Sequence, residues 1–276
     1  MKKIIAPVDF SAVSKNAALY AANMAAFLNI PLVVMHVTEL PISYAEVPTI
    51  PISNVTLMDD DSVKLQEFVT ELDKKLMGQV TIETINRTGN PLYEISSYCN
   101  RLKPYALVIG THGNGSFTRF LLGSNTLGLI RDCSSPIVIV PNGFEFKKPL
   151  KIGLASDLHE VATCTPAEQI RTLVEDLGSK LVILHVDKNG EEDEDEILAE
   201  TRQLNNMFVE QHPKIKILKS VFTEETLLNY AAENQLDLLI VVPKKHSWID
   251  SLIKHQHTKN IALHAPVPVM VLKPTQ

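Results

Sequence analysis

Three glycines, a serine and an asparagine in the first half of the chain have the spacing of a phosphate-binding loop. They follow an apolar run and end at the start of a helical pattern, and they are Gly110, Gly113, Gly123, Ser124 and Asn125. Glycine lets a backbone approach a ligand closely, and the start of a helix offers unpaired N–H groups and the positive end of its dipole. This stretch therefore predicts a site for a phosphorylated ligand.

Asp9 follows the first apolar run, Ile4–Val8, and is the acid expected nearest to this loop. In parallel sheets, ligands bind beyond the carboxyl ends of the strands at the point where the strand order reverses. For a strand order of 3-2-1-4-5, that point lies between the first and fourth strands, so Asp9 would face the Gly110–Gly113 loop. Asp9 has an alternative role, because an aspartate here can also stabilise the turn before the first helix.

Strand-like and helix-like patterns alternate along the chain. Short apolar runs predict strands, and alanine-rich or amphipathic segments predict helices. In the first half the expected strands are 4–8, 32–37, 79–86, 106–109 and 137–140, and the expected helices include 15–29, 59–77 and one that begins near residue 91. A long irregular loop is expected at 38–56, which contains several prolines. The alternation predicts an α/β fold with a five-stranded parallel sheet and helices on both faces.

The second half of the sequence repeats the first. KIGLASD, which begins at Lys151, corresponds to KIIAPVD, which begins at Lys3, and LVILHV, ending at Val186, corresponds to LVVMHV, ending at Val37. A repeat of this length is a whole domain and is far longer than a solenoid unit. The expected domains of this common fold are residues 1–143 and 150–276.

The glycines of the loop are not repeated. The positions of Gly110, Gly113, Gly123 and Ser124 correspond to Val242, Lys245, His255 and Gln256. Side chains there would fill the space that a phosphate loop needs, so the second domain is predicted to be a degenerate partner. The alternative is a repurposed anion or metal site built from the lysines and histidines between residues 244 and 264, although the two rings of a helical His-x-His point to different faces.

These motifs resemble the universal stress protein family in its tandem two-domain form. The resemblance covers essentially the whole chain, and the residues that carry it are Pro7–Ser11, His36–Val37 and the Gly110-x2-Gly113-x9-Gly123-Ser124 pattern. It implies flavodoxin-like, Rossmann-like domains that in many members bind ATP or another adenine nucleotide, including AMP or ADP. Mg²⁺ is compatible with such a site because it prefers phosphate oxygens.

The resemblance also implies a role for each matching residue in binding the nucleotide. The residues that would border the adenine and ribose are Val8, Asp9 and Val37. Those that would lie beside the ribose and the phosphates are Gly110, Thr111, His112, Gly113, Gly123, Ser124 and Asn125. His36, by contrast, ends an apolar strand and is expected to be a packed, hydrogen-bonded histidine.

The composition excludes several classes of protein. The chain has 276 residues, 45% of them hydrophobic, and a net charge of −6. No apolar run approaches the roughly 20 residues of a membrane helix, and no basic stripe suits a nucleic acid. Three cysteines without CxxC spacing suit a reducing cytoplasm. The composition allows the function that the resemblance implies, namely a cytoplasmic stress-response protein, with an unidentified protein partner, that acts as a nucleotide-dependent switch or chaperone-like regulatory factor.

Catalysis is expected to be absent, or limited to slow ATP hydrolysis or autophosphorylation, because the loop lacks the lysine of a P-loop. The alternative from another class is a protein-interaction module that works without nucleotide. The apolar closing strands, 136–140 and 268–272, would be edges that invite pairing. We expect them to join the two copies as an intramolecular pseudo-dimer, and a further homodimer is compatible with the sequence.

Overall fold

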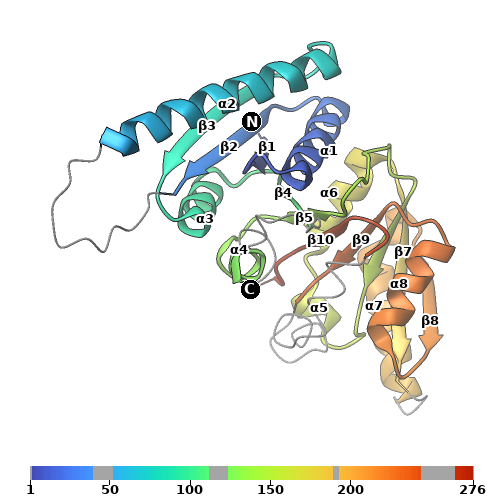
Figure 1. Cartoon of the computed structure of the whole chain (residues 1–276). Coiled ribbons are helices and arrows are strands. Elements are labelled where there is room, and N and C mark those ends of the chain that lie inside the picture. The colour runs from blue at the N-terminus through green and yellow to red at the C-terminus, as the bar shows by residue number, and fades with distance from the viewer. Residues whose placement is uncertain (1, 40–51, 112–123, 189–192, 244–264, 276) are drawn as a thin grey trace, which may run out of the picture. The chain divides into compact units, whose positions relative to one another are not determined.

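The computed structural model describes residues 2–39, 52–111, 124–188, 193–243 and 265–275 (Figure 1). It divides into two compact units, Met1–Ser135 and Pro136–Gln276. The elements of the first unit are β1 (Ile4–Pro7), α1 (Ala12–Leu28), β2 (Leu32–Thr38), α2 (Ile52–Leu76), β3 (Ile82–Thr88), α3 (Pro91–Leu102), β4 (Ala106–Gly110) and α4 (Ser124–Asp132). Strands and helices therefore alternate, as the sequence predicts.

The strands of the first unit are parallel and lie in the order β3-β2-β1-β4. The order reverses at β1, because the chain passes from β1 through β2 to β3 on one side and then returns to place β4 on the other. The 3-2-1-4 part of the predicted order is confirmed here. Strands β2 and β4 are buried along their whole length, which explains why they read as continuous apolar runs.

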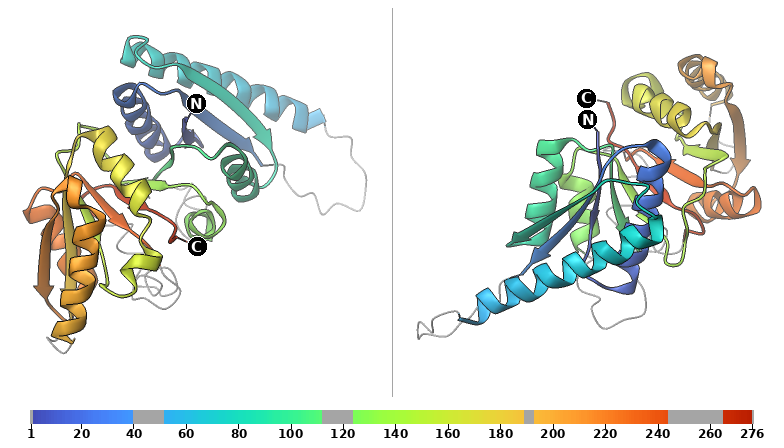
Figure 2. Two further views of the ribbon diagram at one scale, coloured as in Figure 1. Left: turned by 180° about the vertical axis from the view of Figure 1, so that it is seen from behind. Right: turned by 90° about the horizontal axis from the view of Figure 1, so that it is seen from above.

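Helices cover both faces of this sheet. Helices α1 and α2 pack on one face and contact each other, while α3 and α4 lie together on the opposite face (Figures 1 and 2). Most of the alanines of α1 are buried, so the helix lies close against β1 and β4. The predicted α/β architecture with helices on both faces is confirmed.

The helix starts in the first unit follow local capping chemistry. Ser11 caps α1, and its Oγ accepts a hydrogen bond from the Ser14 N–H at 3.2 Å. Asn90 caps α3 and accepts from the Tyr93 N–H at 3.1 Å, with Pro91 in the first turn. The start of α3 agrees with the sequence, whereas α1 begins at Ala12, before the expected residue 15.

Two further predicted boundaries are wrong. Helix α2 begins at Ile52, so the loop expected at 38–56 is too long, and β3 begins at Ile82 and not at residue 79. The residues that open α2, ISNVT, have weak helix propensity, which made them resemble loop. They directly follow a proline in the sequence, and proline favours the position at which a helix starts.

The second unit contains the remaining elements. They are β5 (Ile137–Val140), β6 (Lys151–Ala155), α5 (Val161–Cys164), α6 (Ala167–Leu177), β7 (Lys180–Asp187), α7 (Glu194–Met207), η1 (Val209–Gln211), β8 (Lys214–Lys219), α8 (Thr223–Glu233), β9 (Leu238–Val241) and β10 (Val269–Val271). Five of its strands lie parallel in the order β8-β7-β6-β9-β10, which confirms the predicted 3-2-1-4-5 order.

Strand β5 belongs to the second unit, although it closes the first repeat of the sequence. It pairs antiparallel with β10, and Ile139 lies opposite Val269. Both strands are fully buried. The expected pairing of the two closing strands is therefore confirmed.

Candidate functional site

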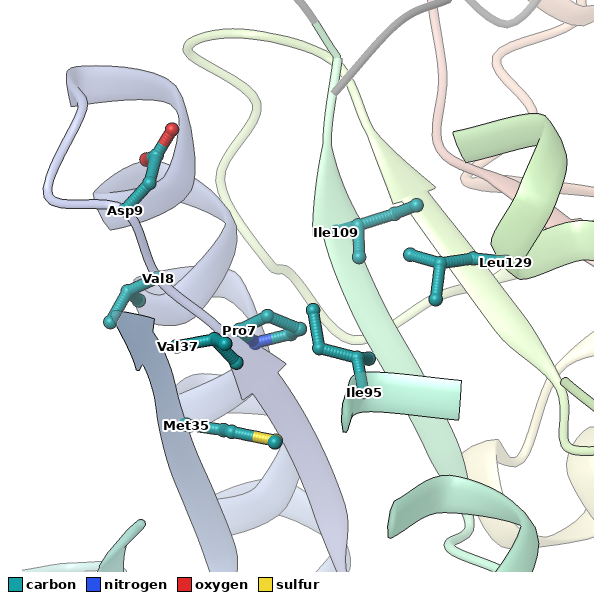
Figure 3. A pocket seen from close by; sticks show the side chains of 8 residues that line it. All are labelled: Pro7, Val8, Asp9, Met35, Val37, Ile95, Ile109 and Leu129. Atoms are coloured by element: carbon teal, nitrogen blue, oxygen red, sulfur yellow. The ribbon is translucent and has the colours of Figure 1, made fainter. Parts of the chain in front are cut away.

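A small hollow opens at the carboxyl ends of β1, β2 and β4 in the first unit (Figure 3). The residues that line it are Pro7, Val8, Asp9, Met35, Val37, Ile95, Ile109 and Leu129. It lies where the strand order reverses between β1 and β4, which is the predicted place for a ligand. The structure thus brings together Val8, Asp9 and Val37, three of the predicted site residues.

The hollow is apolar because strand alternation and helix packing both direct apolar side chains into it. Side chains alternate between the faces of a strand, so Met35 and Val37 share one face of β2. That face is the one covered by α3 and α4, which contribute Ile95 and Leu129 (Figure 3). Apolar side chains of this kind suit a flat organic ring. A few polar groups at the edge of the hollow would then set the orientation of that ring.

Asp9 is the carboxylate at the edge of the hollow. Its Oδ1 accepts hydrogen bonds from the Ser11 N–H at 3.0 Å and the Ser11 hydroxyl at 2.6 Å. The Asp9 N–H donates to Ser14 Oγ at 3.3 Å. Asp9 therefore stabilises the turn before α1, which is the alternative role considered from the sequence. Its other oxygen, Oδ2, has no partner within the described part of the chain, and the carboxylate points away from the apolar side chains (Figure 3).

Gly110 is required by packing at the end of β4. A Cβ atom at this position would lie 2.5 Å from Val13 Cγ1 and 2.8 Å from the Val13 carbonyl oxygen. The strand end thus lies directly against the first turn of α1, and no larger residue fits without movement of the backbone. The contact explains the glycine structurally, while its role beside a ligand stays a prediction.

The other predicted loop residues are placed only in part. Thr111 follows β4 and is 3% exposed. Ser124 is the first residue of α4, and Asn125 follows it. His112, Gly113 and Gly123 lie outside the described residues, as do the side chains of Ser124 and Asn125. Their role in phosphate binding stays a prediction.

His36 joins the hollow to the opposite face of the sheet. Its Nδ1 lies 2.7 Å from the Val8 carbonyl oxygen, and its Nε2 lies 3.3 Å from Asp61 Oδ2 on α2. The ring also stacks on Phe10, with 4.6 Å between ring centroids. The expectation of a packed, hydrogen-bonded histidine is confirmed, since the residue is 8% exposed.

Asp61 is a residue that the sequence reasoning missed. It lies one turn before Leu65 on α2, on the same stripe as the buried Phe68 and Leu72. An acid on the buried stripe of an amphipathic helix needs a polar partner inside the protein. That position was the signal that would have identified it.

Three hydrogen bonds surround the Asp61 carboxylate. Thr38 Oγ1 donates to Oδ2 at 3.0 Å, and Lys64 Nζ donates to Oδ1 at 3.2 Å, in addition to the His36 contact. Burial alone would raise the pKa of Asp61, but the hydrogen bonds from Lys64, Thr38 and His36 outweigh it. They hold its pKa below the usual value of 3.8.

Replacement of Asp61 by asparagine should therefore lower the stability of the first unit by about 1–2 kcal/mol at neutral pH, as expected for charge-assisted hydrogen bonds. Because the folded-state pKa lies below 3.8, the stabilisation is present above that pH and is lost as the pH falls through the folded-state pKa. Thermal unfolding of wild type and Asp61→Asn between neutral and strongly acidic pH checks this. The two melting temperatures should converge in acid, and a constant difference would contradict the prediction.

Two other kinds of feature are absent from the described residues. These residues contain no group of three or more His, Cys, Asp or Glu side chains arranged to hold a metal ion. Within the same residues, none of the helices combines the length and apolar character that crossing a bilayer requires.

Comparison with known proteins gives the same match for both halves of the chain. The sequence profile described as "Universal stress protein family" matches residues 1–141 and again residues 150–273. A universal stress protein of Mycolicibacterium smegmatis is 24% identical over 98% of this chain and 97% of its own length. A universal stress protein of Methanocaldococcus jannaschii is 29% identical over 54% of this chain and 84% of its own length.

Solved structures resemble the chain over nearly its whole length. A universal stress protein from Archaeoglobus fulgidus superimposes with a TM-score of 0.71 at 20% identity, covering 99% of this chain and 97% of that one. A protein of unknown function from Pseudomonas aeruginosa gives a TM-score of 0.64 at 10% identity, covering 99% and 93% of the two chains. At these identities the likeness establishes the fold.

Proposed function

The chain belongs to the universal stress protein family, and on this premise we propose that it binds an adenine nucleotide in its first unit, between the carboxyl ends of β1 and β4. The observation that carries the proposal is the apolar hollow at the reversal of strand order, with the Asp9 carboxylate at its edge. Family resemblance implies ATP, or AMP or ADP, as the ligand.

The hollow and its edge offer complementary chemistry to the parts of a nucleotide. The apolar side chains of Met35, Val37 and Ile109 suit the adenine ring, whose affinity comes largely from burial. Asp9 Oδ2 is an acceptor suited to a ribose hydroxyl. The start of α4, at Ser124, would supply N–H groups to the phosphates, which would bring any Mg²⁺ with them.

Replacement of Asp9 by asparagine should weaken ATP binding by about tenfold, because a hydrogen bond to a charged acceptor contributes about 1.5–3 kcal/mol. Asparagine keeps the Oδ1 acceptor that Ser11 uses, so the turn before α1 is preserved. The measurement is isothermal titration calorimetry of the full chain with ATP and Mg²⁺. The matched control is Asp157→Asn, the equivalent position in the second unit, which should bind as wild type does.

The possible outcomes distinguish the nucleotide-binding hypothesis from its alternatives. Binding of one ATP per chain, weakened by Asp9→Asn and not by Asp157→Asn, supports the proposal. Equal binding by all three proteins would place the site elsewhere. No binding by wild type would favour the alternative, an interaction module that works without nucleotide.

We further propose that nucleotide binding regulates contact with a protein partner, so that the chain works by binding and not by turnover. A cytoplasmic location goes with this proposal. It is supported by the absence of a disulfide among Cys99, Cys133 and Cys164, all of which the structure describes, since thiols stay reduced in the cytoplasm.

A further inference from the structure

The peptide group between Val8 and Asp9 lies at the edge of the hollow, and its carbonyl and its N–H are both hydrogen-bonded. The Val8 N–H donates to the Met35 carbonyl oxygen at 2.8 Å, which continues the pairing of β1 with β2. The Val8 carbonyl oxygen accepts from His36, and the Asp9 N–H donates to Ser14 Oγ. His36 therefore fixes the orientation of this peptide group, and with it the two residues that line the hollow on either side.

His36 reaches this peptide group from the face opposite to the hollow. Along β2, Met35 and Val37 line the hollow on the α3 and α4 side, so His36 between them points to the α2 side. There its Nε2 meets Asp61, which α2 carries. One imidazole ring thus connects the buried face of α2 with the edge of the hollow.

The two contacts of the ring set a condition on its protonation. The Val8 carbonyl oxygen can only accept, so Nδ1 must carry a hydrogen. Asp61 Oδ2 is the oxygen of an ionised carboxylate and also can only accept, so Nε2 must carry a hydrogen as well. Both contacts are hydrogen bonds at once only when the imidazole is doubly protonated, as an imidazolium.

We propose that His36 and Asp61 are positioning residues for the nucleotide site. Their ion pair holds the peptide group between Val8 and Asp9 in the orientation that binds the nucleotide, and it makes nucleotide affinity depend on pH. The inference rests on the proposed function, because it concerns regulation of that same site. When the ring loses its second proton, its Nε2 lone pair faces the carboxylate of Asp61 and the connection to α2 is broken.

The charged groups around the ring come from two parts of the fold. Helix α2 contributes Asp61 and, through it, Lys64. The turn after β1 contributes Asp9, which follows the residue whose carbonyl oxygen contacts the ring. Asp61 is the charged group that contacts the imidazole directly, so it dominates the response of the ring.

The second unit shares the contact between the histidine and a carbonyl oxygen. His185 Nδ1 lies 3.1 Å from the Ser156 carbonyl oxygen, at the equivalent positions of strand and turn. The position of Thr38, however, is taken by Asp187, so a carboxylate is built into β7 itself. The hydrogen bond from the histidine to a carbonyl oxygen is therefore common to both copies. In the first unit, Asp61 connects the histidine to α2, and Thr38 and Lys64 hold the Asp61 carboxylate in place.

Two substitutions of His36 distinguish the effect of its hydrogen bond to Val8 from that of its contact with Asp61. In asparagine the amide nitrogen stands two bonds beyond Cβ, as Nδ1 does, so His36→Asn keeps a donor for Val8. In glutamine it stands one bond further out, as Nε2 does, so His36→Gln keeps a donor for Asp61 and loses the one for Val8. Asp61→Asn removes the charge of the partner. The matched controls are Asp60→Asn, the exposed neighbour, and His185→Asn in the second unit.

The test is calorimetric titration of the full chain and its variants with ATP and Mg²⁺ between about pH 6 and pH 8.5, the range in which histidines change charge. At the acid end, Asp61→Asn and His36→Gln should each bind ATP about fivefold more weakly than wild type, the effect of one hydrogen bond. His36→Asn should match Asp61→Asn, because both keep the Val8 bond and lose the ion pair, and both controls should match wild type.

The ratio of wild-type to Asp61→Asn affinity cancels the titration of the nucleotide itself. It should fall towards one as the pH rises, because wild type then loses the ion pair that the variant never had. Two results would overturn the positioning role and leave the proposed function intact. One is a ratio that stays constant with pH. The other is equal ATP affinity of wild type and Asp61→Asn, with only the melting temperature of the variant lowered. Failure of wild type to bind ATP would overturn both.

Discussion

Replacement of Gly110 by alanine should lower the free energy of unfolding of the first unit by about 2–3 kcal/mol, the upper part of the range for an overpacked core. The added Cβ would meet the Val13 carbonyl oxygen at 2.8 Å and Val13 Cγ1 at 2.5 Å, so α1 and β4 must separate. Chemical denaturation followed by circular dichroism measures the loss. Amide hydrogen exchange in α1 and β4 would show that it falls in this unit.

A matched control is available at Gly128 in α4. A Cβ there would meet Leu92 Cδ2 at 2.6 Å, but that atom is the end of a flexible side chain. Alanine also favours a helix over glycine by about 1 kcal/mol, so Gly128→Ala should be nearly neutral. Adding Val13→Ala to Gly110→Ala should restore only part of the stability, because the carbonyl oxygen remains. Equal losses at the two glycines would contradict the packing role of Gly110.

Replacement of Val37 by phenylalanine should weaken ATP binding by about a hundredfold, which corresponds to about 2.7 kcal/mol. The valine side chain lines the hollow, and the larger ring would occupy the volume assigned to adenine. Titration of the full chain with ATP and Mg²⁺ measures the effect, and circular dichroism checks that the protein is folded.

Val186→Phe is the control for this second substitution. Val186 holds the equivalent position in β7 and is 4% exposed, against 8% for Val37, so both changes overpack a buried strand to a similar degree. Only Val37→Phe should lose affinity. If Val186→Phe loses it as well, or if Val37→Phe binds as wild type does, the nucleotide does not occupy the hollow in the first unit.

The sequence predicted the fold well where a local signal and the tertiary environment agree. Buried strands such as β2 and β4 are apolar along their whole length, and Ser11 and Asn90 cap helices as their chemistry favours. The start of α2 was misplaced because its first residues have weak helix propensity, while the apolar stripe that holds the helix on the sheet begins further on.

The site was predicted only in part, for a different physical reason. Asp9 was found because it ends the first strand of a parallel sheet at the point where the strand order reverses, whereas Val37 was named because the family resemblance implies it. The pairing of His36 with Asp61 spans 25 positions and depends on which face of β2 meets which stripe of α2. Pocket residues such as Ile95 and Leu129 come from helices whose rotation is set by packing, which no spacing in the sequence reveals.

The pairing of β5 with β10 has a consequence for dissecting the chain. A fragment that begins at residue 150, where the second copy of the sequence starts, would contain β10 but not its antiparallel neighbour. The backbone N–H and C=O groups that β5 satisfies would then be exposed along an apolar edge, and such edges recruit other strands. Self-association of that fragment would report a missing strand and would say nothing about the oligomeric state of the intact protein.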